Sequence, residues 1–379
     1  MRVAYICVDP GVPVFGTKGA SVHVQEIVRA FRARGDEVTI YCTRAGTDVP
    51  PDLADVPVVE RRVRAGDTAS REVAIARAAR ELAAEAAASD FVYERFSLFS
   101  DASARVSAPA VVEVNAPLID EQRTHRELVD ERGADAAARR VLAAADVVAC
   151  VSEPVAAWAE EHGARRALVA PNGVNTARIR PSDRAARRPA DRPLEVGFVG
   201  TLKPWHGVEV LIDAMALLPA AVARLVVIGD GPEAPALRER AVRLGVPVDF
   251  RGAVAPAAMP AALAGLDVGV APYPADGDAY FSPLKVYEYL AAGLPVIASE
   301  VGQLPAAVTH AMTGLLVPAG SAPALAAAIA ELASAPVARR RMAQAARDAA
   351  VTRHDWSIVL ASILNESPRA RRDQDEVAA

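Results

Sequence analysis

The sequence predicts an α/β protein that consists of two doubly wound domains of similar size. Short runs rich in valine and isoleucine alternate with longer segments in which Ala, Arg, Glu and Leu follow a helical pattern. This rhythm occurs in both halves of the chain, and it is typical of parallel sheets covered by helices. The chain has 379 residues, which is enough for two domains of ordinary size.

The first half of the chain accounts for the first expected domain, over residues 1–178. Its apolar runs predict strands at 2–8, 37–42, 91–94, 110–114, 146–151 and 167–170. The amphipathic segments between them predict helices at 20–34, 70–88, 119–131 and 154–162. Because strands and helices alternate along the chain, we expect this domain to be Rossmann-like.

The second half repeats the alternation and accounts for a second Rossmann-like domain, over residues 190–352. We expect its strands at 195–199, 224–228, 248–250, 267–271, 295–298 and 314–317. We expect its helices at 207–217, 233–244, 284–292, 322–334 and 337–350. Ligands bind at the carboxyl ends of the strands in such sheets, so two facing domains predict a site in the cleft between them.

Two segments lack apolar periodicity. Residues 176–195 are rich in arginine, proline and aspartate and predict a solvated linker, with a basic patch as the alternative. The polar tail from Arg369 is expected to be frayed.

The composition argues against several classes of protein. The formal net charge is −5 and the pI about 5.8, which gives no indication of nucleic-acid binding. No apolar stretch reaches the roughly 18 residues that a membrane span needs, and the N-terminus lacks the pattern of a secretory leader. The cysteines at 7, 42 and 150 lie in apolar runs and are expected to be buried free thiols. We therefore expect a cytoplasmic protein, with peripheral membrane contact left open.

The segment FSPLKVYEYLAAGLPVIAS, residues 281–299, predicts a helix with an anion at its start. Ser282 suits the N-cap and Pro283 the first helical position. The free amides of Leu284 and Lys285, together with the Lys285 ammonium, would bind an anion. Glu288, one turn later, can accept hydrogen bonds from two vicinal hydroxyls such as those of a ribose. A helical ion pair with Lys285 is the alternative.

The loop after the first strand, within residues 9–27, is rich in glycine and proline. Gly16 and Gly19 would let a ligand approach the backbone, and Lys18 with the first amides of the next helix would attract phosphate. The alternative is an ordinary connection that uses glycine to turn.

Polar residues follow two other predicted strands. Asn115 comes directly after strand 110–114, where it either faces the site or makes a local turn before Pro117. Lys203 lies in the loop GTLKPWHG, residues 200–207, and is a phosphate ligand if it is not simply solvated. The glycines of VVIGDGPE, residues 226–233, lack the third glycine of a dinucleotide fingerprint and indicate a tight turn.

These segments, taken together and in this order, resemble the family-4 retaining glycosyltransferases of the GT-B fold. The matching stretches cover nearly the whole chain; they are KGASVHVQE, PNGVN at 171–175, VGTLKPWHG, IGDGPE, FRGAV at 250–254 and SPLKVYEYLAAGLPVIAS. The resemblance implies a hexosyltransferase-type enzyme, expected to be bacterial. It would move a sugar from a nucleotide-diphosphate sugar to a hydroxyl of a glycan, natural-product or lipid-linked acceptor.

The resemblance also implies roles for single residues. Glu288 matches the glutamate that binds the nucleotide ribose, and the donor diphosphate would be held in the loop of Lys203 and His206. The remaining donor contacts fall on Gly16, Gly19, Gly252, Val254, Ser282, Leu284 and Lys285, with the base at Gly252 and Val254. Asn115 would serve catalysis, Arg95 would face the acceptor unless it is structural, and a last helix at about 355–369 would pack back onto the first domain.

Two residues depart from the family pattern. Tyr280 replaces the first glutamate of the family's E-x₇-E motif, and Asn115 stands where many members have histidine. Asp276 and Asp278 form DGD on the wrong kind of loop for a metal motif, so we expect neither metal nor other cofactor. The leaving phosphate would deprotonate the acceptor in a front-face displacement, so no protein nucleophile is needed. The alternatives are an inactive nucleotide-binding homologue or partner subunit and a GT-B-like sugar-nucleotide epimerase or phosphorylase.

Overall fold

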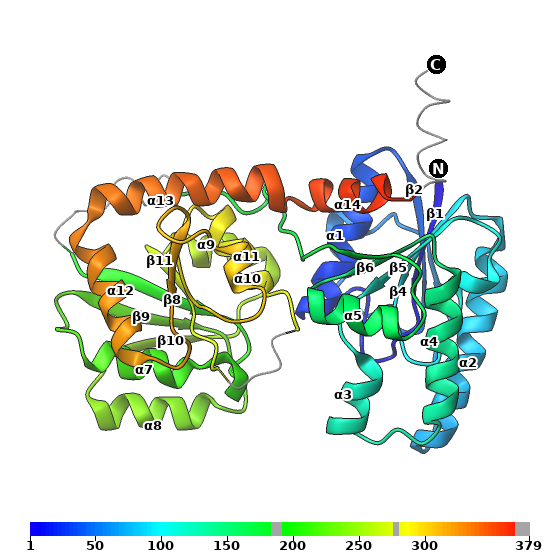
Figure 1. Ribbon diagram of the computed structural model, residues 1–379, viewed down its shortest axis with the longest axis horizontal. Helices are drawn as coiled ribbons and strands as arrows, with labels where there is room; N and C mark the ends of the chain where they lie inside the picture. Colours follow the sequence, from blue (N-terminus) through cyan, green and yellow to red (C-terminus); the bar gives the residue numbers. More distant parts are fainter. Residues whose placement is uncertain (183–191, 276–279, 368–379) are drawn as a thin grey trace. The chain divides into compact units, whose positions relative to one another are not determined.

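The computed structural model describes residues 1–182, 192–275 and 280–367. They form two compact units (Figure 1). Unit 1 comprises Met1–Asn172 and the chain from Trp356 onward, and unit 2 comprises Gly173–Asp355. Asp276, Asp278 and the tail from Arg369 lie outside the described residues, so the expectations for them stay predictions.

Unit 1 is built on a seven-stranded parallel sheet with the order β3-β2-β1-β4-β5-β6-β7. The strands are β1 Arg2–Cys7, β2 Glu37–Cys42, β3 Val58–Glu60, β4 Phe91–Arg95, β5 Ala110–Val114, β6 Val147–Cys150 and β7 Ala167–Val169. The predicted strands are confirmed except that β3 was missed, because three half-exposed residues carry too little apolar pattern.

The helices of unit 1 cover this sheet (Figure 1). They are α1 Gly19–Ala33, α2 Thr68–Glu85, α3 Leu118–His125, α4 Glu131–Ala144, α5 Glu153–Glu161 and α14 Trp356–Asn365, with the short η3 Ser103–Arg105 after β4. Helix α14 packs beside α1, as expected for a last helix that returns to the first domain.

The single helix expected at 119–131 is wrong, because two helices occupy this region with a break between them. Asp130 caps α4 by accepting a hydrogen bond from Gly133 N at 2.9 Å. The buried carboxylate of Glu72 accepts from Val129 N at 2.9 Å and Asp130 N at 2.8 Å, which fixes the break. The boundary between α3 and α4 is therefore set by a side chain of α2, and the local sequence alone does not predict it.

Unit 2 is built on a six-stranded parallel sheet with the order β10-β9-β8-β11-β12-β13. The strands are β8 Leu194–Val199, β9 Ala223–Ile228, β10 Val248–Gly252, β11 Val268–Ala271, β12 Val296–Ser299 and β13 Gly314–Val317. The helices are α7 Val208–Ala216, α8 Ala234–Leu244, α9 Met259–Leu263, α10 Leu284–Ala291, α11 Leu304–Ala307, α12 Ala322–Ser334 and α13 Pro336–Ala349, with η4 Pro204–His206 and η5 Pro256–Ala258.

Each face of this second sheet has its own apolar core. Helices α7, α8 and α12 cover one core, and α9, α10, α11 and α13 cover the other. Both domains therefore have the predicted doubly wound form.

The linker expected at 176–195 is wrong for its first part, which is packed into unit 2. Ile179 is fully buried, and Val174 bridges to Asp355. The guanidinium of Arg347 donates to the carbonyl oxygens of Ile179 at 2.8 Å and Thr176 at 3.0 Å. Unit 2 therefore begins after Asn172, earlier than the expected boundary at 178, and residues 183–191 lie outside the described part.

Two expectations from the composition can be compared with the structure. The cysteines Cys7, Cys42 and Cys150 are buried and free, as predicted, and burial raises the pKa of each thiol to about 12. In the described part of the chain, no helix combines the length and apolar character that crossing a membrane requires.

Candidate functional site

Lys285, in the first turn of α10, is a buried cation without a hydrogen-bond partner. The residue is 9 % exposed, and its Nζ has no acceptor among the described residues. The ammonium lies 4.3 Å from the ring centre of Phe198 and 5.1 Å from that of Tyr273. It also lies against Gly200, where a Cβ would come within 3.1 Å of Nζ. Glycine at 200 therefore leaves room for the ammonium beneath the loop that follows β8.

The protonation of Lys285 depends on what occupies this place. Burial lowers the pKa of Lys285 to about 7, and the carboxylate of Glu288 opposes this shift. An anion beside Nζ would raise the pKa again, because it stabilises the charged form. A buried, unpaired lysine is a candidate ligand-binding group for this reason.

Lys203 and His206 lie in the loop after β8, as predicted. Lys203 extends its Nζ over the ring of Trp205 at 5.4 Å, and no ion pair holds it among the described residues. His206 lies between Trp205, Phe198 and Tyr273, with its Nδ1 directed at the carbonyl oxygen of Thr201.

His206 is neutral near pH 7 in the free protein, so it can contribute a positive charge to a diphosphate only if ligand binding protonates it. Burial and the charge of Lys285 lower the pKa of His206 to about 4. Since Nδ1 must donate to the Thr201 carbonyl, Nε2 carries no proton and acts as an acceptor. The positive charge beside this loop therefore comes from Lys203 and Lys285.

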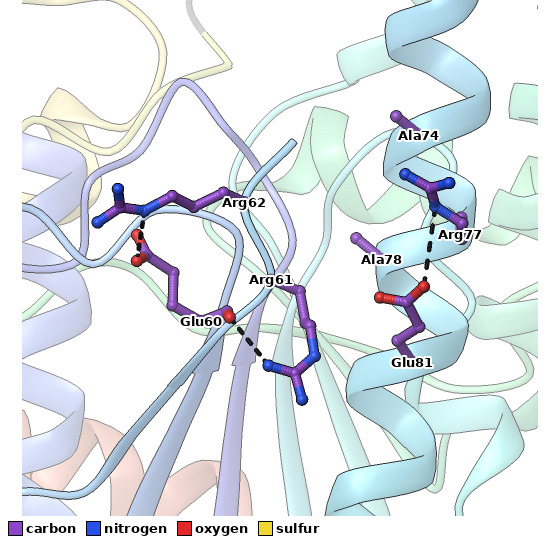
Figure 2. A pocket seen from close by; sticks show the side chains of 7 residues that line it. All are labelled: Glu60, Arg61, Arg62, Ala74, Arg77, Ala78 and Glu81. Carbon is purple, nitrogen blue, oxygen red and sulfur yellow. Dashed lines mark hydrogen bonds and ion pairs between the residues drawn. The ribbon is translucent and has the colours of Figure 1, made fainter. Parts of the chain in front are cut away.

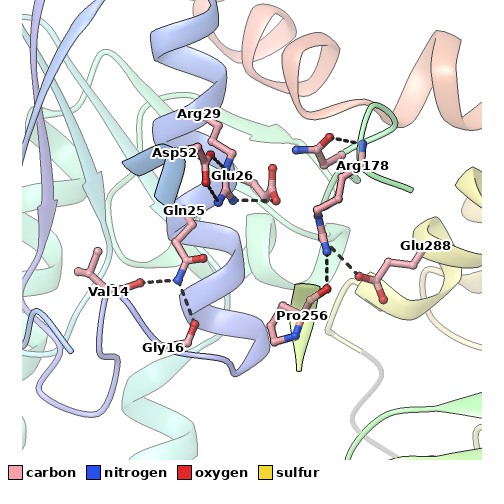
Figure 3. A network of polar contacts seen from close by, with 10 residues as sticks. Val14, Gly16, Gln25, Glu26, Arg29, Asp52, Arg178, Pro256 and Glu288 are labelled. Carbon is pink, nitrogen blue, oxygen red and sulfur yellow. Dashed lines mark hydrogen bonds and ion pairs between the residues drawn. The ribbon is translucent and has the colours of Figure 1, made fainter. Parts of the chain in front are cut away.

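Glu288 lies near an arginine that the composition of residues 176–195 assigned to a solvated linker (Figure 3). Arg178 Nη2 is 3.9 Å from Glu288 Oε1, and Arg178 Nη1 donates to the Pro256 carbonyl at 2.8 Å. Arg178 thus connects Glu288 with η5, which follows the loop of Gly252 and Val254. The only sequence signal was its place three residues after the end of PNGVN.

The start of α10 differs by one residue from the prediction. Pro283 is the N-cap and Leu284 the first helical residue, so Ser282 lies one residue before the cap. The buried Ser282 hydroxyl instead donates to Tyr287 Oη at 3.3 Å. The amides of Leu284 and Lys285 have no backbone acceptor among the described residues, and their binding of a ligand stays a prediction.

The glycines directly after β9 and at the end of β10 have a packing role. Gly229 N donates to Gly252 O at 2.7 Å, and both residues have positive φ. A Cβ on Gly229 would lie 1.8 Å from Gly200 O, and one on Gly231 would lie 2.4 Å from Leu202 O. The tight turn predicted at 226–233 is therefore present, and it supports the loop that carries Lys203.

The glycine-rich loop of unit 1 is held by a side chain of α1 (Figure 3). Gln25 Nε2 donates to Val14 O at 3.0 Å and to Gly16 O at 2.9 Å. Gly19 is the first residue of α1, and Lys18 is an N-cap whose side chain makes no capping bond. The helix thus starts with amides that its own N-cap side chain does not satisfy.

Asn115 and Arg95 meet at one buried carboxylate, that of Glu113 on β5. Oε1 accepts from Asn115 Nδ2 and from Arg95 Nη1, the latter at 3.1 Å. Oε2 accepts from His23 Nε2 at 2.8 Å and from the Tyr93 hydroxyl at 2.7 Å. The Asn115 amide nitrogen is thus bound to a side chain of the preceding strand, that of Glu113, and whether Asn115 faces a substrate stays a prediction. A glutamate inside the apolar run VVEV was the signal for Glu113, and it was missed.

Two predicted features of the site are left, the residue Tyr280 and the absence of a metal site. Tyr280 lies in the turn before α10, next to Phe281. Among the described residues, no group of three or more His, Cys, Asp and Glu side chains could hold a metal ion.

A pocket of about 290 Å³ lies in unit 1 beside β3 and α2 (Figure 2). Its lining is Glu60, Arg61, Arg62, Ala74, Arg77, Ala78 and Glu81. Each arginine here is paired with a carboxylate: Arg62 with Glu60, Arg77 with Glu81, and Arg61 with Glu85 outside the pocket. The pocket therefore offers little uncompensated charge, and we assign no ligand to it.

Two family models match the chain. "Glycosyltransferase Family 4" matches residues 17–178, and "Glycosyl transferases group 1" matches residues 193–335. The first match contains the Glu113 cluster, and the second contains Lys203 and Lys285.

Named relatives match over different lengths. The D-inositol 3-phosphate glycosyltransferase of Acidothermus cellulolyticus is 31% identical over 358 residues, which is 83% of this chain and 79% of that protein. The phosphatidyl-myo-inositol mannosyltransferase of Mycobacterium leprae is 33% identical over 220 residues, and this match spans only 56% of each chain.

Solved structures share the fold at low identity. HepE of Anabaena, in complex with UDP and glucose, has a TM-score of 0.72 at 20% identity and covers 96% of this chain and 98% of its own. Sucrose-phosphate synthase from Thermosynechococcus elongatus has a TM-score of 0.73 at 21% identity, with both chains fully covered. With two parallel Rossmann-like sheets, matches to both family models and a relative that aligns over most of its length, the chain belongs to glycosyltransferase family 4 and has the GT-B fold.

Proposed function

We propose that this protein is a retaining glycosyltransferase that transfers a sugar from a nucleoside-diphosphate sugar to an acceptor hydroxyl without a metal ion. The buried, unpartnered ammonium of Lys285 beside the free amides of α10 is the observation that carries the proposal. A diphosphate is the anion that this group of donors suits, because it accepts from an ammonium and from amides at once.

The donor nucleotide then lies along the loops of unit 2. The diphosphate is held by Lys285, Lys203 and the amides of Leu284 and Lys285. The ribose is held by Glu288, whose carboxylate can accept hydrogen bonds from two vicinal hydroxyls. The base is held by the backbone near Gly252 and Val254. Arg178 keeps the Glu288 side chain near the segment that follows this backbone.

The reaction requires stabilisation of the leaving diphosphate. As the bond between the anomeric carbon and the phosphate oxygen breaks, negative charge grows on the diphosphate. Lys203, Lys285 and the helix amides stabilise that charge electrostatically, so a metal ion is not needed. The acceptor oxygen bonds to the same face of the anomeric carbon, and its proton passes to the leaving phosphate. Domain closure would exclude water and limit hydrolysis of the donor.

The relatives narrow the substrates to be tested. Three of them are named for inositol-containing acceptors, and one of these three, from Mycobacterium tuberculosis, is named as GDP-mannose-dependent. HepE was crystallised with UDP-glucose. We therefore propose a hexose donor of UDP or GDP and an acceptor with a polyol hydroxyl, for which D-inositol 3-phosphate is the first probe.

The first test is calorimetric titration with UDP, GDP, ADP, dTDP and CDP in the presence of EDTA. One nucleotide should bind in preference, and Glu288→Ala should weaken it about 10- to 100-fold, since the ribose hydroxyls lose a charged acceptor. Transfer that persists in EDTA would support the metal-independent mechanism. An α-linked product from an α-linked donor, identified by NMR, would support retention of configuration.

Each part of the proposal would be contradicted by a different result. If no nucleotide binds, or if Glu288→Ala binds equally well, the donor assignment is wrong. If a nucleotide binds but none of the nucleotide sugars is consumed, the inactive homologue suggested by Tyr280 and Asn115 is the better account. Loss of transfer in EDTA, restored by a divalent ion, would exclude the metal-independent mechanism.

A further inference from the structure

The Glu113 carboxylate accepts four hydrogen bonds from side chains that come from three elements of unit 1. His23 is on α1, Tyr93 and Arg95 are on β4, and Asn115 directly follows β5. The Glu113 side chain is only 4 % exposed. A buried carboxylate with this many donors is held in one position, and it holds its donors in turn.

Glu113 is ionised at any pH at which the enzyme would work. Burial alone would raise its pKa, but the bonds and charges of His23 and Arg95 and the Tyr93 hydroxyl outweigh burial and lower the pKa to about 2. An ionised carboxylate can only accept hydrogen bonds.

This property determines which end of the Asn115 amide faces Glu113. The opposite orientation would bring the carbonyl Oδ1 against a carboxylate oxygen, and two acceptors would repel each other. Asn115 must therefore give its Nδ2 to Glu113, and its Oδ1 is left pointing away from that carboxylate. No hydrogen bond to Oδ1 is found among the described residues, and Asn115 is partly exposed. The outward group at this strand end is thus an acceptor.

We propose that Glu113 is a positioning residue that presents the Asn115 carbonyl oxygen to a substrate hydroxyl, so that this position selects for a hydrogen-bond donor. The hydroxyl belongs either to the transferred sugar or to the acceptor, and the inference rests on the proposed glycosyl transfer. Recognition of a hydroxyl in this way penalises an analogue that lacks the proton, because the bound analogue would shield the Asn115 oxygen from water and leave it unpaired.

Replacing Glu113 by glutamine would remove this control. A glutamine amide can either donate or accept, so the Asn115 amide can turn over and present Nδ2 to the substrate. Asn115→Leu keeps a similar volume but removes the outward oxygen altogether. Glu94→Gln is the matched control, because Glu94 is a fully buried glutamate on β4 that bonds Ser100 and Ser103 and not Asn115.

The experiment compares each hydroxyl with fluorine, which cannot donate a proton. The donor probes are UDP-glucose and GDP-mannose and their single deoxyfluoro analogues; the acceptor probes are D-inositol 3-phosphate and its deoxyfluoro analogues. The quantity measured is the ratio of kcat/KM for the hydroxyl and fluoro compounds. Fluorine also slows the chemistry electronically, but this effect is common to all variants and cancels when their ratios are compared.

We expect one hydroxyl position at which the kcat/KM ratio in the wild type and in Glu94→Gln is 10- to 100-fold higher than in Glu113→Gln and Asn115→Leu. If that position is on the sugar, Asn115 accepts a hydrogen bond from the donor. If it is on the inositol, Asn115 accepts a hydrogen bond from the acceptor. UDP and GDP binding should be unchanged in both variants, since these ligands lack the hydroxyl concerned.

Equal ratios in all four proteins would overturn the inference while leaving the proposed transfer intact. A ratio that falls as much in Glu94→Gln would also overturn it, because the effect would then be structural. If Glu113→Gln does not fold, Asn115→Leu decides alone, and an unchanged ratio there overturns the inference. A wild type that neither binds nucleotides nor transfers sugar would overturn the proposed function, and this inference with it.

Discussion

At the scale of single residues, Lys285 shows how a binding-site residue can be energetically unfavourable in the free protein and be stabilised by the ligand. An ammonium buried without a partner destabilises the free protein, and the lowered pKa of about 7 reflects this cost. Two aromatic rings and the space at Gly200 accommodate the side chain but do not satisfy its three N–H donors. A diphosphate would satisfy them and would restore the charge.

Nucleoside diphosphate binding should therefore take up a proton. In the free protein Lys285 is mostly neutral above pH 7, whereas the complex requires it charged, so affinity should fall as pH rises. From pH 7.5 to 8.5, where the nucleotide phosphates are already ionised, Kd should weaken roughly five- to tenfold. Calorimetry at pH 8 in buffers of different ionisation enthalpy measures the uptake directly.

Two variants separate this effect from a general loss of charge. Lys285→Met should bind weakly with no dependence on pH over this range. Lys203→Met should also bind more weakly but should keep the wild-type slope, because its ammonium is not enclosed in the same way. A flat profile in the wild type would rule out Lys285 as the diphosphate ligand.

At the scale of the elements, the loops after β8 and β9 are in direct backbone contact at two glycines, Gly200 and Gly229. Gly229 has φ of +146°, and its Cα faces Gly200 O so closely that no Cβ fits. The donor-side loop therefore depends on a neighbouring turn that contacts no ligand itself.

Gly229→Ala should destabilise unit 2 by about 3 kcal/mol or more, because backbone strain and a clash with a backbone oxygen add. Gly245→Ala is the matched control, since Gly245 also has a positive φ, of +67°, but nothing lies within 4 Å of the place that an added methyl group would take. It should cost only about 1 kcal/mol. Urea unfolding of both variants gives the comparison, and equal losses would show that the packing argument is wrong.

The elements also show what local sequence can predict. Long apolar runs and helical periods sufficed for most strands and helices, because each buries a full face against its own sheet. The break at 126–130 and the packing of residues 173–180 were missed, since distant side chains, Glu72 and Arg347, decide them. The local sequence carried a signal for Arg178 and for Glu113, but their roles were missed because the partners Glu288 and His23 are distant in the sequence.

At the scale of the whole molecule, α14 completes unit 1 although unit 2 precedes it in the chain. Trp356, Val359, Leu360, Ile363 and Leu364 are buried, and the Trp356 ring lies 4.6 Å from that of His23. Burial of side chains of this size contributes about 1.5–3 kcal/mol each.

A chain that ends at Asp355 should therefore lose most of the stability of unit 1, because the apolar face of α1 loses its cover. Unit 2 should keep its fold, and with it the nucleoside diphosphate affinity proposed above. Hydrogen exchange measured by mass spectrometry should show faster exchange over α1 and β5 and unchanged exchange over α10. Protection of α1 equal to that of the full chain would contradict this.

The late position of α14 has a consequence for biosynthesis. A ribosome that has made the whole seven-stranded sheet has still to make all of unit 2 before the helix that covers α1 emerges. During that interval α1 shows an apolar face to the surroundings, which is a condition that favours association with chaperones or with other nascent chains. Unit 2, although second in the chain, is the first part that can finish folding.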